Sequence, residues 1–146
     1  MHFGRTGLSA LVLTEQKSRF LLAARQLGKK SITTAANIKR LLDRLPAAAS
    51  ASLTFDNGGE FAAHRSLGIS TYFCDPHSPW QKGAVENTIG RLRRILSQPE
   101  SFNTQSDDPF DALIASHNNT PRKCLRFRTP MEAFLSQIQT SVALDL

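Results

Sequence analysis

The stretch that decides the fold is Ser52-Leu-Thr-Phe-Asp-Asn-Gly-Gly-Glu-Phe61. Its first four residues have the character of a β-strand, and Asp56-Asn-Gly-Gly59 follows as a turn that the glycines force. A short helical piece over Glu60–Leu67 and a further strand over Ile69–Phe73 are predicted beyond this turn. Asp56 therefore stands at the carboxyl end of a predicted strand, where open α/β sheets place their ligands.

Upstream of this stretch the sequence predicts a pair of strands and a helix. The apolar runs Leu8–Leu13 and Arg19–Arg25, separated by a polar segment, are expected to be two antiparallel strands. Gly4-Arg-Thr-Gly7 has the composition of a tight turn, which implies a further strand on its other side. Ser31 is expected to cap a helix that runs to about Leu45.

Downstream, loops and helices alternate. Residues 75–80 contain two prolines and are predicted to form a loop. A helix is expected from Gln81 to about Leu96, with an apolar stripe of Val85, Ile89, Leu92 and Leu96. The other expected segments are a polar connection over 99–108, a helix from Pro109 to about Ser116, a basic loop over Asn118–Arg128 and a helix from Pro130 to about Gln139. These elements give an α/β order, and residues 1–146 are predicted to form a single domain.

The composition is that of a basic globular protein. Eighteen Lys and Arg residues against twelve Asp and Glu give a net charge of +6. Such a charge favours polyanions, because each neutralised phosphate releases condensed counterions. No apolar run approaches the roughly 20 residues that span a bilayer, and no secretion signal is recognisable, so we expect a cytoplasmic protein without a membrane partner. Cys74 and Cys124 are expected to be reduced thiols.

Two carboxylates are the candidates for chemistry. An ordinary Asp-Asn-Gly turn explains Asp56 as well as a functional role does. Glu86 is expected one step from the apolar stripe of its helix, where it would border the core, although taken alone a solvated helix residue is the more ordinary interpretation. Gly90 and Arg93 follow on the same helix face, and this row suits a phosphate backbone.

Three sequence blocks in a fixed order are much more specific than any single residue. They are Thr54-Phe-Asp-Asn-Gly-Gly-Glu-Phe61, Tyr72-Phe-Cys-Asp-Pro-His-Ser-Pro-Trp-Gln-Lys-Gly-Ala-Val-Glu-Asn87 and His117-Asn-Asn-Thr-Pro-Arg-Lys-Cys-Leu125. From Gly4 to about Phe134 the chain closely resembles the integrase-type core of bacterial insertion-sequence transposases of the IS-thirty family. The resemblance implies an RNase H-like fold, which is a mixed sheet with flanking helices. It also implies DNA transposition and integration, in which transposon ends are cut and the new 3′-OH is joined to target DNA.

In this family three carboxylates hold two divalent cations, and the resemblance makes Asp56 the second carboxylate and Glu86 the third. The expected ions are Mg²⁺ or Mn²⁺, because carboxylate oxygens suit hard cations that keep positions open for phosphate oxygens. One ion would activate the nucleophile, and the other would stabilise the leaving oxygen. Asp75, between the two candidates, is expected to cap a turn and not to bind metal.

The chain departs from the family's pattern in three ways. By the resemblance, the family's first aspartate would fall upstream of Met1, so we expect the first strand to be incomplete. We expect the helix-turn-helix region that recognises transposon ends to be missing as well. The interval from Asp56 to Glu86 is a few residues short near 66–69. We therefore expect an N-terminally truncated remnant that is inactive in this form, because its metal affinity is weakened.

The alternative is a non-enzymatic nucleic-acid-binding fragment that docks on DNA or on a full-length transposase. A nuclease of RNA–DNA hybrids shares the fold, but the Trp80–Asn87 block does not support it.

Seven further residues are expected to contact DNA. Trp80 can stack on a base, although an anchor of its loop against the core is the more ordinary role. The arginines beside Glu86 can be a solvated face, but DNA contact is favoured. For the cations after Pro121, DNA contact and ion pairs with nearby aspartates are equally consistent. The predicted DNA contacts are Trp80, Lys82, Arg91, Arg93, Arg94, Arg122 and Lys123. A homo-oligomer is expected by resemblance alone.

Overall fold

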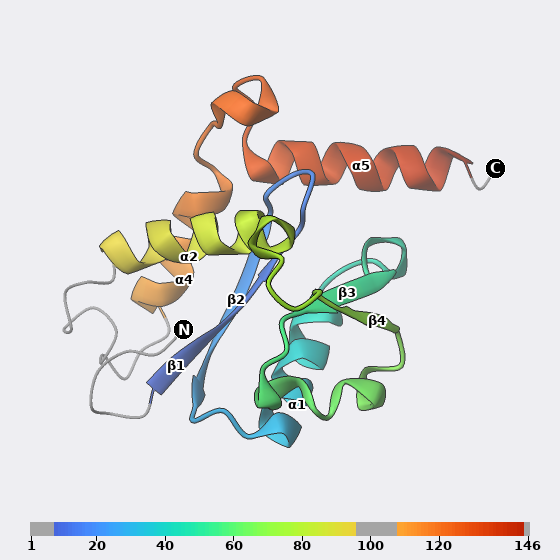
Figure 1. Cartoon of the computed structure of the whole chain (residues 1–146). Helices are drawn as coiled ribbons and strands as arrows, with labels where there is room; N and C mark the ends of the chain where they lie inside the picture. The colour runs from blue at the N-terminus through green and yellow to red at the C-terminus, as the bar shows by residue number, and fades with distance from the viewer. Residues whose placement is uncertain (1–7, 96–107, 145–146) are drawn as a thin grey trace. The chain divides into compact units, whose positions relative to one another are not determined.

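The structure is a computed structural model that describes residues 8–95 and 108–144 (Figure 1). The predicted turn over Gly4–Gly7 with its preceding strand, and nearly all of the polar connection from Pro99, lie outside the described residues. The described chain forms two compact units. The first holds residues 8–11 and 24–83, and the second holds 12–23, 84–95 and 108–144. The single domain over residues 1–146 stays a prediction.

The first two strands form a hairpin that contributes to both units. β1 (Leu8–Thr14) pairs with β2 (Leu21–Leu27) in a two-stranded sheet (Figure 1). The amide of Glu15 donates to the carbonyl of Phe20 at 2.8 Å across the connection. A connection this short permits only antiparallel pairing, so the expected strand pair is confirmed. β2 begins later than expected because Arg19 has a φ of 62° and belongs to the turn.

In the first unit, two short strands pair in parallel. β3 (Ser52–Phe55) lies beside β4 (Ser70–Phe73), with Ser52 opposite Ser70 and Phe55 opposite Phe73 (Figure 1). The chain crosses between them through two 3₁₀ turns, η3 (Gly59–Phe61) and η4 (His64–Leu67), where one helical piece was expected. Phe55 is buried, and its ring stacks on Phe61 with 4.6 Å between the centroids. Both predicted strands are thus confirmed.

The helix of the first unit covers these turns. α1 (Ser31–Leu42) contacts η3 and η4, and it buries Thr34, Ala35, Ile38 and Leu41 at helical spacing. The expectation that Ser31 caps the helix is wrong. Lys30 is the N-cap, and its carbonyl already accepts the Thr34 amide at 2.9 Å, so Ser31 is the first helical residue.

α1 also ends before the expected Leu45. The amides of Arg44 and Leu45 bond the carbonyls of Leu41 and Leu42, three residues back, at 3.3 and 2.9 Å. This tightening ends the helix at Leu42. The small-residue connector that follows contains a further 3₁₀ turn, η2 (Ala47–Ala49).

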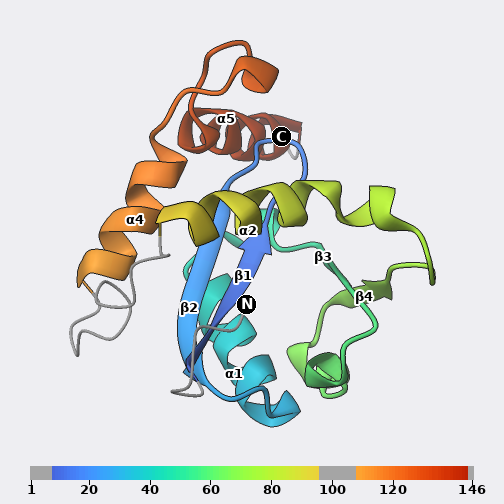
Figure 2. The same cartoon turned by 60° about the vertical axis from the view of Figure 1, so that its left-hand side comes forward.

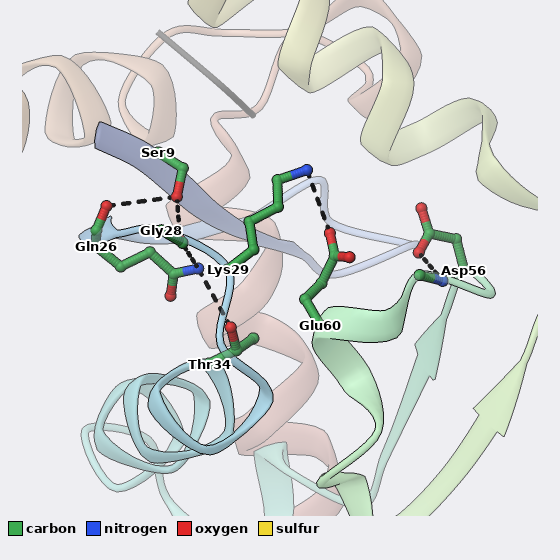
Figure 3. Close-up of polar contacts among 8 residues, drawn as sticks. Ser9, Gln26, Gly28, Lys29, Thr34, Asp56 and Glu60 are labelled. Carbon is green, nitrogen blue, oxygen red and sulfur yellow. Dashed lines mark hydrogen bonds and ion pairs between the residues drawn. The ribbon is translucent and has the colours of Figure 1, made fainter. Parts of the chain in front are cut away.

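A buried polar network joins the strand ends of the first unit to α1. Ser9 Oγ donates to the carbonyl of Gly28 at 2.9 Å and to that of Gln26 at 3.4 Å (Figure 3). The side chain of Gln26 then donates to Thr34 Oγ1 at 3.3 Å and accepts from Asn37 at 3.1 Å. Ser9, Gln26 and Thr34 are all buried, so these bonds satisfy polar groups that water does not reach.

The described part of the second unit consists of three α-helices and the turn of the hairpin. α2 (Gly83–Ile95) starts after the 3₁₀ turn η5 (Pro79–Lys82), so it begins later than the expected Gln81. α4 (Asp108–Asn118) contacts α5 (Pro130–Leu144), and the chain between them includes η6 (Lys123–Leu125) (Figure 2). Phe20 stacks on Phe134 of α5 with 4.3 Å between the ring centroids. The buried apolar side chains here include Phe20, Leu21, Leu92, Phe110 and Phe134.

The two cysteines of the chain differ in burial but not in oxidation state. Cys74 is buried and Cys124 is exposed, and both are free thiols, as expected. Within residues 8–95 and 108–144, no helix combines the length and the apolar character that crossing a membrane requires.

The C-terminus of α4 is bound to β2 by one amide side chain. Asn118 Oδ1 accepts the Leu21 amide at 2.9 Å, and Asn118 Nδ2 donates to the Leu21 carbonyl at 2.9 Å. Both residues are almost fully buried. The Asn118 side chain thus provides hydrogen-bond partners for both the amide and the carbonyl of Leu21, as the backbone of a neighbouring strand would.

The residue before it, His117, is buried in a basic surrounding. Burial lowers the pKa of His117 to about 4, and the positive charges of Arg122 and Arg91 act in the same direction, against a hydrogen bond with the Arg19 backbone. Its Nε2 atom has no hydrogen-bond partner within the described part of the chain. The imidazole is therefore neutral near pH 7.

We predict that Asn118→Ala lowers the free energy of unfolding by about 2–3 kcal/mol, because it leaves both buried backbone groups of Leu21 unpaired. Asn119→Ala is the matched control. Asn119 is exposed and bonds only within its own helix end, to the Ala115 carbonyl at 2.9 Å. Urea denaturation of the two variants measures the difference, and equal losses would contradict the proposed role of Asn118.

We predict that the stability of the protein falls as the pH drops from 6.5 toward 4. The folded pKa of His117, about 4, lies below its ordinary value of 6.5, so the unfolded chain binds the proton more tightly in this window. The part of the free energy of unfolding that depends on neutral His117 is fully present above pH 6.5. It amounts to something on the order of 2 kcal/mol. Urea titrations at both ends of the window should show a shallower dependence for His117→Gln. An unchanged dependence would refute this assignment.

Candidate functional site

Asp56 lies directly after β3 on a turn that is bound to the end of β4. The carbonyl of the buried Phe55 accepts the Cys74 amide at 2.8 Å, which continues the parallel ladder past the strands. Asn57 Nδ2 donates to the Cys74 carbonyl at 3.1 Å. Asp56 itself is exposed, and its Oδ1 accepts the Gly58 amide at 3.0 Å (Figure 3). The predicted turn is confirmed, and it presents a carboxylate at the carboxyl end of a strand.

A second carboxylate faces the same turn. A Cβ atom built on Gly58 would lie 2.6 Å from Glu60 Oε2 and 2.9 Å from Asp56 Oδ1. The backbone of Gly58, with φ −71° and ψ 139°, suits any residue, so the close approach of the two carboxylates and not the conformation requires glycine. A Cβ on Gly59 would meet nothing within 4 Å.

Glu60 is held by a cation from the end of the hairpin. Lys29 Nζ lies 3.6 Å from Glu60 Oε1, and both side chains are partly exposed (Figure 3). Sequence reasoning did not single out Lys29 or Glu60. The available signal was the Gly-Gly-Glu run that follows Asp56, since paired glycines indicate a close approach as well as a turn.

Glu86 lies in the first turn of α2 and is exposed. The expectation that it borders the core is wrong, because the buried side chains of this helix are Thr88 and Leu92. Arg93 is exposed as well. Since residues four and seven positions apart lie on one helix face, Glu86, Gly90 and Arg93 form the expected row.

Trp80 does not anchor its loop against the core, which corrects the more ordinary of the two expected roles. Its side chain, on η5, is 76% exposed. The neighbouring Gln81 braces the loop instead. Gln81 Oε1 accepts the Asp75 amide, and Gln81 Nε2 donates to Asp75 Oδ2, both at 2.9 Å. Asp75 therefore stabilises a turn, as expected, and the Trp80 ring is left exposed to solvent. Lys82, at the end of η5, is half-buried.

The predicted basic residues of the second unit divide into exposed and partly buried groups. Arg91, Arg93, Arg94 and Lys123 are exposed. Arg122 is half-buried, and its Nη2 donates to the His117 carbonyl at 3.2 Å, which stabilises the C-terminal end of α4. Burial and the nearby charge of Arg91 lower the pKa of Arg122. Arg122 thus has a structural bond that neither of its expected roles included.

The carboxylates have the right chemistry for a hard cation, but their assembly stays a prediction. Asp56 belongs to the first unit and Glu86 to the second. Among the residues that the structure describes, no three His, Cys, Asp or Glu side chains gather in a way that would hold a metal ion. Each carboxylate is exposed and supplies the oxygen ligands that Mg²⁺ prefers.

Comparison with curated proteins finds a consistent set of relatives. Transposase InsI for insertion sequence element IS30A of Escherichia coli (strain K12) is 38% identical over 124 residues, which are 82% of this chain and 32% of that protein. The transposase for insertion sequence element IS1086 of Cupriavidus metallidurans is 37% identical over 131 residues, 87% of this chain and 38% of the relative. The chain thus spans about a third of the length of these relatives. No protein-family model matches it.

Comparison with solved structures shows the fold. The catalytic core domain of BIV integrase matches with a TM-score of 0.72 at 24% identity, over 91% of this chain and 89% of that domain. The expected α/β fold of the RNase H-like type is therefore confirmed. Because transposase relatives align over more than four fifths of its length and its fold is that of an integrase core, the chain belongs to the IS30 family of insertion-sequence transposases.

Proposed function

We propose that this chain is the catalytic core of a DNA transposase, with Asp56 and Glu86 as two of its metal-binding carboxylates. The observation that best supports this function is the exposed Asp56 carboxylate at the carboxyl end of β3, on a turn bound to β4. Open α/β sheets place their ligands at the carboxyl ends of strands. The chain's relatives are transposases, and its fold is that of the catalytic core domain of an integrase. Mg²⁺ or Mn²⁺ is the proposed cofactor.

The proposed reaction is phosphoryl transfer between DNA strands. An oxygen nucleophile, water in cleavage and a 3′-OH in strand transfer, attacks phosphorus, and the bond from phosphorus to the leaving 3′ oxygen breaks. When bound, divalent cations supply the positive charge that such a transfer needs on the attacking and leaving oxygens. Asp56 contributes an oxygen that the Gly58 amide orients, and Glu86 contributes a second from the first turn of α2.

DNA is the proposed partner, both as transposon ends and as target. The exposed arginines of α2 provide phosphate contacts, and the exposed ring of Trp80 provides a stacking surface. Lys82, Arg122 and Lys123 complete the proposed contacts. A second copy of this chain or a full-length transposase is a further proposed partner, in the cytoplasm of a bacterium.

Strand transfer by the purified chain, with labelled insertion-sequence ends and Mg²⁺ or Mn²⁺, tests the proposal. If the chain turns over, which would contradict the expected inactive remnant, Asp56→Asn and Glu86→Gln should lower the rate by at least about a hundredfold, because each removes a charged metal ligand. They should also weaken Mn²⁺ binding in calorimetry. Asp75→Asn is the control, since Asn keeps the contact with Gln81 and should leave both measurements near wild type. Salt-dependent DNA binding without any turnover would instead favour a non-enzymatic binding fragment.

Gly58→Ala tests whether the close approach of two carboxylates matters. We expect Mn²⁺ affinity to fall several-fold, because the added methyl displaces the side chains of Asp56 and Glu60. The free energy of unfolding should change by less than about 1 kcal/mol, since the crowded atoms are ends of side chains that can swing aside.

Gly59→Ala is the matched control for this test, because its Cβ has open space. Equal Mn²⁺ affinities for the two variants would show that the close approach of Asp56 and Glu60 at Gly58 does not contribute to metal binding.

A further inference from the structure

The loop between α4 and α5 exposes a phenylalanine on a strained backbone. Phe127 is 73% exposed, and it follows Arg126, so that two successive residues other than glycine have φ of 55° and 63°. The left-handed region is unfavourable for both side chains. Such strain persists only where surrounding contacts impose it, and it is concentrated at binding and catalytic sites.

The contacts that impose this conformation close the loop on itself. The Arg122 carbonyl accepts the amides of Leu125 at 3.0 Å and Phe127 at 2.9 Å, and the Arg122 amide donates to the Arg128 carbonyl at 3.0 Å. Leu125 is buried and anchors the middle of the loop. Residues 122–128, here called the arginine loop, are therefore preorganised, and both Figure 1 and Figure 2 show this segment projecting beyond α4 and α5.

Both ends of the arginine loop are also fixed. Upstream, Arg122 bonds the His117 carbonyl at the end of α4. Downstream, the Thr129 amide donates to Glu132 Oε2 at 2.8 Å, and the Glu132 amide donates to Thr129 Oγ1 at 3.1 Å, which is a capping box at the start of α5. Glu132, the acidic residue nearest the loop in sequence, is engaged in this cap.

All charged residues of the arginine loop itself are cationic. The arginine loop contains Arg122, Lys123, Arg126 and Arg128, and the sequence has no Asp or Glu between Asp111 and Glu132. An apolar ring amid cations fits a ligand that offers anions and flat apolar faces together, as DNA does with its phosphates and bases. One phenylalanine covers far less area than the roughly 800 Å² per partner of a stable protein interface.

We propose that the arginine loop is a second DNA contact, in which its cations bind phosphates and the Phe127 ring stacks on an unpaired base. The choice of DNA as partner rests on the proposed function. A ring that protrudes from a rigid loop can enter only where bases are already parted, so the contact favours distorted or frayed DNA over perfect duplex. Because the loop is preorganised, binding does not have to order it.

The test measures the affinity of the whole chain for a short duplex with a central unpaired stretch and for its fully paired counterpart, by fluorescence anisotropy over a range of salt. We expect Phe127→Ala to weaken binding to the unpaired substrate about tenfold and to the paired one much less. Phe127→Trp should restore the preference, since it keeps an aromatic face. The salt dependence should be unchanged in both variants, whereas Arg128→Gln should lower its slope by about one.

The matched control is Leu135→Ala, which removes an exposed apolar side chain of α5 in the same unit and should leave both affinities within about twofold. Equal losses for Phe127→Ala and Leu135→Ala, or no loss in either, would overturn the proposal. A change in the sedimentation coefficient of the chain on Phe127→Ala would also overturn it, because Phe127 would then lie in an interface between two copies of the chain. If the chain binds DNA without catalysing strand transfer and Phe127→Ala weakens that binding, the result supports the contact by the arginine loop and rejects only the catalytic proposal.

Discussion

The parallel pairing of β3 with β4 is the constraint on which the candidate site depends. Burial of Phe55 and its stacking on Phe61 hold the end of β3 in the core of its unit, and the ladder extends beyond the strands to Cys74. The chain must then leave the sheet at Asp56, in a turn that Asn57 fastens to the other strand. The position of the carboxylate is thus a consequence of hydrophobic burial one residue earlier.

The C-terminal end of α4 takes part in both the packing and the electrostatics of the second unit. Asn118 binds the backbone of β2, His117 is buried and neutral, and Arg122 bonds the carbonyl of His117. The His117 imidazole is desolvated and lies near the positive charges of Arg122 and Arg91. Protonation of this imidazole is therefore electrostatically unfavourable. The same bonds determine where the arginine loop begins, so the fold of the second unit and the display of its cations are coupled.

Much of this arrangement was predictable from the sequence, because it follows from local signals. The alternation and turn chemistry around Asp56 predicted β3 and its turn, and the apolar spacing predicted α2 with Leu92 buried. Three ordered blocks predicted the family. These signals are short-range in sequence, and their physical causes, namely backbone sterics and burial of one face, act over a few residues.

Other features depended on contacts between distant segments and could not be predicted in this way. For Trp80, anchoring its loop against the core was the more ordinary of two expected roles, yet Gln81 stabilises the loop and the ring is exposed to solvent. Lys29 and Glu60 meet only because the hairpin end and the β3 turn belong to one compact unit. Ser31 gave a capping signal, but the backbone entered the helix one residue earlier.

The two thiols of the chain differ in accessibility, and this difference has a practical consequence. Cys74 is buried beside the β3 turn, whereas Cys124 is exposed within the arginine loop. An alkylating dye can therefore reach one cysteine of the folded protein and not the other. The native chain already carries a single addressable position for a fluorophore or spin label, at the segment whose approach to DNA is of interest, without any engineered substitution.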